Sequence, residues 1–454
     1  MHRKVSGLAV EGSAGRLPAE LTKFLSQETY SLLIKGPSGS GKTALALTIL
    51  AKFRASENVL YLSTRTSTSQ LAKSYPWIGK AAGLAAGPAP KGAPGEGSET
   101  LVDARLDEPG VVFERITNVL MDRHAPMVVV DSWEALNESM EAEALRTNIR
   151  VLQTWRERAG ARFLFIGEDA TNSSIDSVVD GVVSLSEQVV YGRRLREIYL
   201  SKLHGVQISS PKYFFSLENG VFSSFERYTQ SDLPTGRGTS RREPGRVGKA
   251  GRHSTGFRQL DQILGGGYHG KSMAWIEMDP QVDSRAVVAF LSGTVREWAE
   301  SGSSVLLQMS EVVDASMVAQ LKASLRGSAH ENLKVWGPAA GKGGRVDYMS
   351  LLQSNMATAP TPVLCIVDYD KFARRGPSTK TAASESLMDF LRRRAELSIL
   401  VTRSGHPLSG IVSTHLRIID LGGTLFVMSE KPWSELYAVV PGPGAGGMSL
   451  ERVV

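Results

Sequence analysis

The chain has 454 residues, of which 42% are hydrophobic and 22% charged, and it carries a formal net charge of +6. This length exceeds what one ordinary hydrophobic core requires, so two domains are expected. The single cysteine, Cys365, excludes an internal disulfide framework. No segment approaches the roughly twenty apolar residues that span a membrane. We therefore expect a cytoplasmic protein without a membrane partner.

The first half alternates short apolar runs with segments of helical length. Helical segments are expected at Thr43 to Phe53 and at Gly110 to Arg123. The apolar runs, each expected to form a strand, are Tyr30 to Lys35, Val59 to Ser63, Met127 to Val130 and Arg162 to Ile166. Such alternation is typical of an α/β domain with a mainly parallel sheet flanked by helices.

A glycine-rich segment, GPSGSGKT, lies between the first expected strand and the helix that follows it. It satisfies the pattern G-x-x-x-x-G-K-[ST] in the strand-to-helix context that a phosphate-binding loop requires. Glycines let successive backbone N–H groups point at phosphate oxygens, and the helix N-terminus adds a positive dipole. The predicted nucleotide-binding residues are Gly36, Pro37, Ser38, Gly39, Ser40, Gly41, Lys42 and Thr43.

Magnesium at such a loop needs an acid at the end of a neighbouring strand, and Asp131 directly follows the run MVVV. We therefore predict Thr43 and Asp131 as Mg²⁺ ligands, with Lys42 on the β and γ phosphates. Asp131 as a simple cap of the next helix is the alternative. No N-K-x-D motif for guanine is present, which favours ATP as the nucleotide.

The second half repeats the order of the first. The runs expected to form its strands are Ser272 to Met278, Val305 to Met309, Val363 to Val367 and Ser398 to Val401, with helical stretches at Ser284 to Ala299 and Ala382 to Glu396. Pro37 and Asp131 are 94 residues apart, and Pro280 and Asp368 are 88 residues apart. Each pair joins a loop after one strand to an acid that ends another, so internal duplication is the simplest explanation.

A phosphate-binding loop is missing from the second half, where the corresponding segment reads EMDPQVDSRAVV. Glu277, Asp279 and Asp283 would repel phosphate there, so we expect a degenerate domain. Asp368 and Glu311 occupy the places of a magnesium acid and a catalytic glutamate, and we expect them to cap helices or form local hydrogen bonds.

The segment 231–255 carries six Lys or Arg residues against Asp232 and Glu243, a net charge of +4. Its Gly, Pro, Ser and Thr content cannot supply a hydrophobic face, so it is expected to be a flexible basic linker. A solvated tether is one interpretation of it, and a contact with nucleic acid, a membrane surface or an acidic partner is the alternative. The segment from Gly87 to Glu99 reads as a second disordered insertion. The expected division is therefore 1–230, linker 231–255 and 256–454.

The order of these motifs resembles the RecA superfamily and, within it, the KaiC-like branch. The segment GFRQLDQILGGGY from Gly256 to Tyr268 is similar to the entry of a KaiC-type domain. The first half, with LPAELTKFLSQETYSLLIKGPSGSGKTALAL, LYLSTRTSTSQL and YPWI, resembles the archaeal family of the gas-vesicle regulatory protein GvpD. The resemblance implies two tandem RecA/KaiC-like domains, the second degenerate.

In RecA and KaiC relatives, a glutamate at the end of the strand after the phosphate loop orients the attacking water. Here that strand ends in STRT, so the acid is absent and no catalytic residue is assigned. Arg65 is left either to face phosphate or a partner, or to lie exposed on the surface. Glu134 and Glu168 are the two acids that could substitute. The missing carboxylate predicts slow turnover or nucleotide gating alone.

KaiC-like rings also send a K-x-R-G hairpin to the nucleotide of the next subunit. In this chain Lys202 matches the lysine, His204 replaces the arginine and Gly205 matches the glycine. The resemblance implies a phosphate contact in trans within a homo-oligomer, and a solvated hairpin is the alternative. The expected function is an ATP-binding regulatory switch that acts on another protein. The alternative is a RecA-like DNA-dependent ATPase that uses the basic linker.

Overall fold

The computed structural model describes residues 15–53, 58–78, 101–137, 140–168, 175–228, 251–308, 310, 313–337, 347–373, 377–403, 405–442 and 448–454. They form two compact units. The first runs up to Glu226 and includes Val453 and Val454, and the second runs from Arg227 to Arg452. The expected insertion at 87–99 and residues 231–250 of the expected linker lie outside the described residues.

The first unit is built on a nine-stranded mixed sheet among its described residues. Its strands are β1 (Tyr30–Lys35), β2 (Val59–Ser63), β3 (Leu101–Asp103), β4 (Met127–Asp131), β5 (Arg162–Ile166), β6 (Gly181–Val190), β7 (Arg193–Leu203), β8 (Lys212–Ser216) and β9 (Ser223–Ser224). Its helices are α1 (Ala19–Leu25), α2 (Lys42–Lys52), α3 (Thr68–Ser74), α5 (Pro109–Asp122), α6 (Trp133–Asn137), α7 (Ala142–Ala159) and the 3₁₀ turn η1 (Glu218–Gly220).

Strand order places the ends of distant segments beside one another. The order is β3-β2-β4-β5-β1-β6-β7-β8-β9, and the pairs from β3 through β6 are parallel. Because parallel strands end at the same edge, the residues that follow β1, β2, β4 and β5 share the carboxyl edge of the sheet. The strands β6 to β9 are joined by antiparallel pairing.

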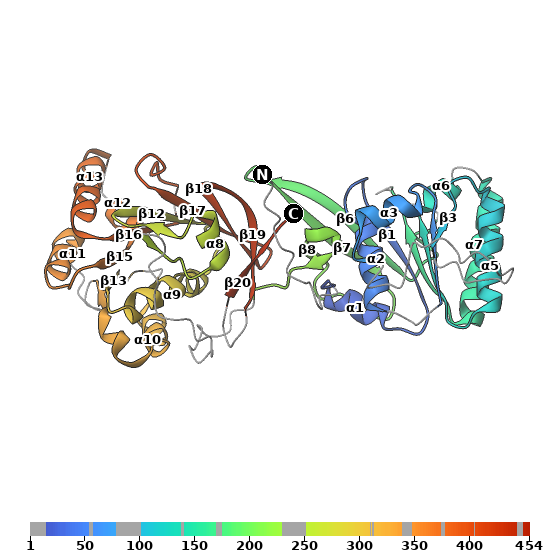
Figure 1. Cartoon of the computed structure of the whole chain (residues 1–454), viewed down its shortest axis with the longest axis horizontal. Coiled ribbons are helices and arrows are strands. Elements are labelled where there is room, and N and C mark those ends of the chain that lie inside the picture. The colour runs from blue at the N-terminus through green and yellow to red at the C-terminus, as the bar shows by residue number, and fades with distance from the viewer. Residues whose placement is uncertain are drawn as a thin grey trace, which may run out of the picture. The chain divides into compact units, whose positions relative to one another are not determined.

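Helices cover both faces of this sheet, as Figure 1 shows. One core joins the strands to α1 and α2 and includes Phe24, Leu45 and Ile49. The other core joins the opposite face to α5, α6 and α7. All six residues of β1 are buried, as expected of a central strand that is covered on both faces.

The second unit is built on a second nine-stranded sheet among its described residues. Its strands are β12 (Ser272–Met278), β13 (Ser304–Gln308), β14 (Leu333–Trp336), β15 (Val363–Asp368), β16 (Leu397–Thr402), β17 (Thr414–Leu421), β18 (Thr424–Lys431), β19 (Trp433–Pro441) and β20 (Met448–Arg452), with β10 (Arg252–His253) and β11 (Tyr268–His269) forming a separate pair. Its helices are α8 (Arg258–Ile263), α9 (Ser284–Glu300), α10 (Ala315–Ala323), η2 (Gly327–Asn332), α11 (Tyr348–Ala357), α12 (Tyr369–Ala373) and α13 (Pro377–Arg394).

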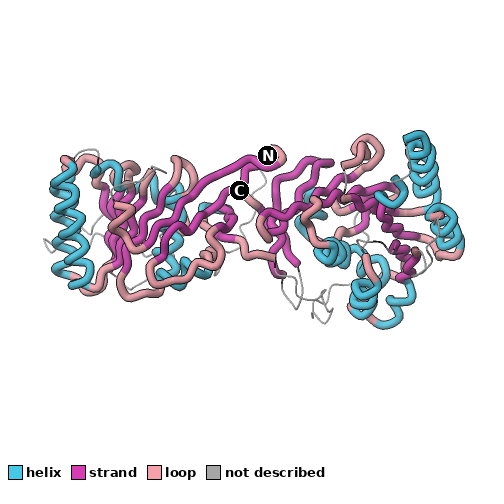
Figure 2. The backbone as a smooth tube through the Cα atoms, turned by 180° about the vertical axis from the view of Figure 1, so that it is seen from behind, coloured by secondary structure: helices cyan, strands magenta, loops and turns pink. Residues whose placement is uncertain are grey.

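The two sheets have the same strand order. In the second unit the order is β14-β13-β15-β16-β12-β17-β18-β19-β20, so β12 corresponds to β1, β15 to β4 and β16 to β5. Helices α8, α9 and α10 pack on one face, and α11, α12 and α13 pack on the other. Figure 2 shows the strands of each unit as an inner layer with helices outside. The predicted fold class, two tandem α/β domains with mainly parallel sheets, is confirmed.

No helix in the described ranges is both long enough and apolar enough to cross a membrane.

Candidate functional site

The predicted phosphate-binding loop connects the carboxyl end of β1 to the amino end of α2. Gly36, Gly39 and Gly41 have φ angles of 149°, 80° and 103°, in the region that favours glycine. A Cβ atom at Gly36 would lie 2.4 Å from the Leu185 carbonyl oxygen of β6. The loop can therefore wrap closely against β6 only because this residue has no side chain.

Lys42, the first residue of α2, folds its side chain back over the loop. Its Nζ donates hydrogen bonds to the carbonyl oxygens of Gly36 at 2.6 Å and Pro37 at 2.9 Å. The side chain is buried, and burial lowers the pKa of the ammonium. The carboxylates of Glu168, Asp131 and Glu134 act against that shift, so acidic groups surround this amine.

Thr43 and Asp131 meet across the carboxyl edge, as the sequence predicts. The Thr43 hydroxyl donates to Asp131 Oδ2 over 2.8 Å, although the two residues are 88 positions apart. The same oxygen accepts a hydrogen bond from the Tyr61 hydroxyl over 2.7 Å. Tyr61 is fully buried, and burial together with the nearby Asp131 charge raises its pKa well above the ordinary value. The phenol therefore acts as a neutral donor that fixes the carboxylate.

Several features of the loop fit a phosphate group. Pro37, Ser38 and Gly39 are exposed at its rim, whereas Ser40 is buried. The Ser40 hydroxyl has no hydrogen-bond partner within the described ranges. The loop also stands at the N-terminus of an eleven-residue helix, whose first N–H groups and dipole attract anions. A buried donor without a partner beside such a helix end is what a phosphate oxygen could satisfy.

Magnesium fits the same edge through two oxygens of the protein. Thr43 Oγ1 and Asp131 Oδ2 already lie within hydrogen-bond distance of each other. No group of three or more His, Cys, Asp or Glu residues that could hold a metal is found in the part of the chain that the structure describes. Mg²⁺ does not need such a group at a phosphate loop, because substrate phosphates and water complete its octahedral shell.

Three further charged residues are brought to this edge from separate strand ends. Arg65, after β2, forms an ion pair with Glu168, after β5. The Glu168 backbone N–H donates to Glu134 Oε1 over 2.6 Å. Burial raises the pKa of Glu134 above the ordinary value for a carboxyl group. The two acids and the arginine that the sequence left as separate alternatives therefore form one cluster beside the phosphate-binding loop.

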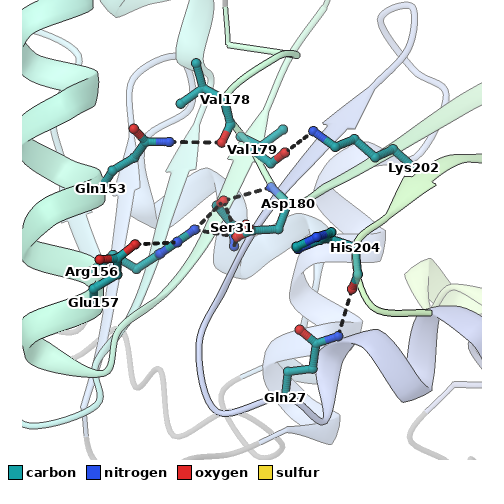
Figure 3. A network of polar contacts seen from close by, with 10 residues as sticks. All are labelled: Gln27, Ser31, Gln153, Arg156, Glu157, Val178, Val179, Asp180, Lys202 and His204. Atoms are coloured by element: carbon teal, nitrogen blue, oxygen red, sulfur yellow. Dashed lines mark hydrogen bonds and ion pairs between the residues drawn. The ribbon is translucent and has the colours of Figure 1, made fainter.

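Lys202 and His204 lie away from the loop of their own unit. The Lys202 ammonium donates to the carbonyl oxygen of Val179, which precedes β6, over 2.6 Å (Figure 3). The backbone N–H of His204 donates to Asp180, and its carbonyl oxygen accepts from Gln27. Because β6 runs parallel to β1, these contacts are at the amino edge, opposite the loop. These two residues therefore lie at the edge of the sheet opposite to a phosphate bound at the loop of their own unit.

The corresponding loop of the second unit, 279–283, is occupied by contacts from its own chain. Arg403, directly after β16, donates from Nη1 to the Val282 carbonyl oxygen over 3.0 Å and from Nη2 to Ser284 Oγ over 2.6 Å. The Asp283 carboxylate accepts from the Arg285 N–H over 2.8 Å and so caps α9. The helix end that would face a phosphate is thus neutralised internally.

The other acidic residues of this half have local partners or lie elsewhere. Glu277, expected to repel phosphate from the loop, belongs to β12 and is paired with His415 over 2.9 Å and Arg417 over 2.6 Å. Its charge is therefore compensated. Asp368 ends β15 in a buried position, and its backbone N–H donates to the Gln308 side chain. Glu311 lies outside the described residues.

Two residues of these sites were not identified from the sequence. Tyr61 stands in the middle of an apolar run, where an aromatic residue is ordinary, and only the neighbouring position of β2 and β4 reveals its bond to Asp131. Arg403 follows its strand as an ordinary basic residue. Because β16 corresponds to β5, the duplication places Arg403 at the carboxyl edge of the second sheet, and this position could have indicated a contact with the loop.

Comparison with known proteins supports the assignment of a phosphate-binding loop to the first unit. Residues 21–201 match the family described as "GvpD gas vesicle protein, P-loop domain". Among curated proteins of Halobacterium salinarum, protein GvpD1 is 28% identical over 292 residues, 62% of this chain and 54% of that protein. Protein GvpD2 is 26% identical over 303 residues, 63% of this chain and 60% of that protein. The chain thus matches just over half the length of each relative. The predicted resemblance to the GvpD family is confirmed: residues 21–201 are similar to the P-loop domain of that family, and the two curated relatives share 26–28% identity with the chain.

Proposed function

We propose that the chain is an ATP-binding regulatory protein whose first unit is a nucleotide-dependent switch with slow ATP hydrolysis. The observation that carries this proposal is the convergence of Lys42, Thr43 and Asp131 at the carboxyl edge of the first sheet. Lys42 would exchange its bonds to two loop carbonyls for bonds to the β and γ phosphates. Thr43 and Asp131 would hold Mg²⁺, which would neutralise phosphate charge when bound.

Switch behaviour is supported by the charge at the loop. Asp131, Glu134 and Glu168 bring three negative charges near Lys42 and Arg65, which bring two positive charges. A triphosphate entering this site without a cation would meet net repulsion, so binding is proposed to depend on Mg²⁺. Redistribution of the ion pairs on binding would then differ between ATP and ADP, which is the requirement for a nucleotide-controlled conformation.

Slow hydrolysis is supported by the end of β2. The residues Ser63 to Thr66 contain no carboxylate, and Arg65 is engaged by Glu168. Water is therefore not positioned from this strand, so we propose turnover below about 1 per second, an ordinary lower value for enzymes.

A role connected with gas vesicles is proposed from the description of the matching family as a gas vesicle protein, and the regulatory part of that role from the resemblance stated for the sequence. The second unit, whose loop is filled by Arg403, is proposed to be a degenerate domain that presents a surface to another protein. Lys202 and His204 are proposed to contact the nucleotide of a second copy of the chain, since they lie opposite the loop of their own unit.

The test is steady-state phosphate release from Mg-ATP by the full chain, measured with and without duplex DNA at increasing salt. A regulatory switch is expected to release phosphate slowly and independently of DNA. Release that DNA stimulates, with a steep loss as salt rises, would instead identify a DNA-dependent ATPase that uses segment 231–255.

A further inference from the structure

Glu134 occupies a rigid position beside the phosphate-binding loop. It belongs to the first turn of α6, next to Trp133, which is buried and packs edge-on against Phe165 with ring centroids 5.0 Å apart. A Cβ atom at Gly167 would lie 2.9 Å from Glu134 Oε1, so the carboxylate fits tightly against the backbone that follows β5. The side chain is therefore held in place by the core and by its neighbouring backbone.

The two oxygens of this carboxylate differ in their bonding. Oε1 accepts the Glu168 N–H over 2.6 Å. Oε2 is buried and has no hydrogen-bond partner in the described part of the chain. An acceptor left in this state costs folding free energy unless a water molecule or a ligand donates a hydrogen bond to it.

The other acids of the cluster already have partners. Asp131 Oδ2 accepts from Thr43 and Tyr61, and the Glu168 carboxylate is paired with Arg65. Glu134 accepts one hydrogen bond, from a backbone N–H, and forms no ion pair among the described residues, and its charge is close enough to Lys42 to oppose the lowering of that pKa. Of the three carboxylates near the amine, Glu134 is thus the one with a buried oxygen that has no hydrogen-bond partner among the described residues.

We propose that Glu134 is the catalytic residue that accepts the proton of the attacking water in ATP hydrolysis at this loop. This inference rests on the proposed function of the loop. In the step, the water oxygen bonds to the γ-phosphorus as its proton passes to Glu134 Oε2. The bond from that phosphorus to the bridging oxygen breaks, and its electron pair stays on ADP beside Lys42. Glu134 then releases the proton to solvent, with ADP and inorganic phosphate as products.

The experiment compares the wild-type chain with Glu134→Gln and with Glu157→Gln. Glutamine keeps an oxygen for the Glu168 N–H but cannot take a proton. Glu157 is an exposed acid on α7 of the same unit and serves as the matched control. Binding is measured with Mg-ATP, and turnover is measured under single-turnover conditions with enzyme in excess. Thermal unfolding of each variant confirms that it is folded.

We expect Glu134→Gln to bind Mg-ATP as tightly as the wild type or more tightly, because it removes a negative charge near the phosphates. Its hydrolysis rate should fall by about 100-fold or more, the range for a lost general base, while Glu157→Gln hydrolyses at the wild-type rate. Equal rates in Glu134→Gln and the wild type, including the case where neither hydrolyses bound ATP, would overturn the assignment. Failure of the wild type to bind Mg-ATP would instead refute the function of the loop itself.

Discussion

Charged side chains at the phosphate-binding loop differ in how completely they are paired. Lys42 and Asp131 each have two hydrogen bonds that fix their orientation. Glu134 has one oxygen that accepts a hydrogen bond and one without a partner among the described residues. A paired group loses little folding free energy when no ligand is bound, whereas a buried acceptor without a hydrogen-bond partner lowers the stability of the folded state. Stability measurements on single-residue variants can therefore distinguish two kinds of group. The first kind stabilises the folded chain through its hydrogen bonds, and the second kind destabilises it but is available to a ligand.

Tyr61 belongs to the first kind. Tyr61→Phe removes the hydroxyl that donates to Asp131 and leaves a partly buried carboxylate with one bond fewer. We expect the free energy of unfolding to fall by about 1–3 kcal/mol, the range for a lost hydrogen bond to a charged group. Denaturant unfolding measures this directly. Tyr199→Phe, at a half-exposed position on β7, is the control and should leave the unfolding free energy unchanged.

Glu134 belongs to the second kind. Its pKa is raised by burial in the folded chain, so the folded state binds more protons than the unfolded state as the pH rises above the ordinary value of 4.5. Ionisation of Glu134 therefore costs stability in that window. We expect Glu134→Gln to be the more stable protein, by a margin that grows between about pH 4.5 and neutrality. Unfolding curves of both proteins across this range test the sign, and a margin that shrinks with pH would contradict it.

At the scale of elements, the loop of the second unit is bound by the side chain of Arg403, at the position where a nucleotide would bind the loop of the first unit. Arg403 ties β16 to the loop and to the start of α9, and its backbone N–H donates to the buried Asp370 over 2.8 Å. This arrangement orders the loop without any nucleotide.

Arg403→Ala should therefore destabilise the second unit. Removal of the guanidinium leaves the Val282 carbonyl oxygen and the Ser284 hydroxyl without these donors, at an expected cost of about 1–3 kcal/mol. Denaturant unfolding followed by tryptophan fluorescence, to which Trp275 and Trp298 of the second unit contribute, would report the change. Arg392→Ala removes an exposed arginine of α13 and should have no measurable effect. An equal loss in both variants would show that Arg403 has no special role.

The sequence predicted the inner parallel strands closely, but it predicted neither the parallel edge strands β3 and β14 nor the antiparallel extensions. The runs at Tyr30 to Lys35 and Ser272 to Met278 coincide with β1 and β12, because a strand covered on both faces is apolar throughout. Strands β6 and β7 mix buried and exposed positions, so their pattern does not stand out from that of a loop. A contact such as the ion pair of Arg65 with Glu168 can be predicted only when the order of the strands in the sheet is known. The spacing of apolar residues along the chain does not give that order.

At the scale of the whole molecule, two sheets of the same strand order carry different loops at the corresponding position. Both have the same strand order, yet one presents a glycine loop with Lys42 and the other a loop bound by Arg403. The proposed function therefore predicts one ATP site per chain at these two loops.

Hydrogen exchange in the presence of Mg-ATP can test this division in the intact chain. We expect slower exchange in peptides that cover Gly36 to Thr43, because amides that bind phosphate are protected. Peptides that cover the loop 279–283 should exchange at the same rate with and without nucleotide. Protection of both loops would show that the second unit also binds, contrary to the proposed degeneracy.

The most direct test of the central claim is equilibrium binding of Mg-ATP to the full chain and to Lys42→Ala. Lys52→Ala, an exposed lysine in the last turn of the same helix, is the control. We predict saturable, Mg²⁺-dependent binding by the wild type and by Lys52→Ala, and its loss in Lys42→Ala. No binding by the wild type, or unchanged affinity in folded Lys42→Ala, would contradict a nucleotide site at this loop.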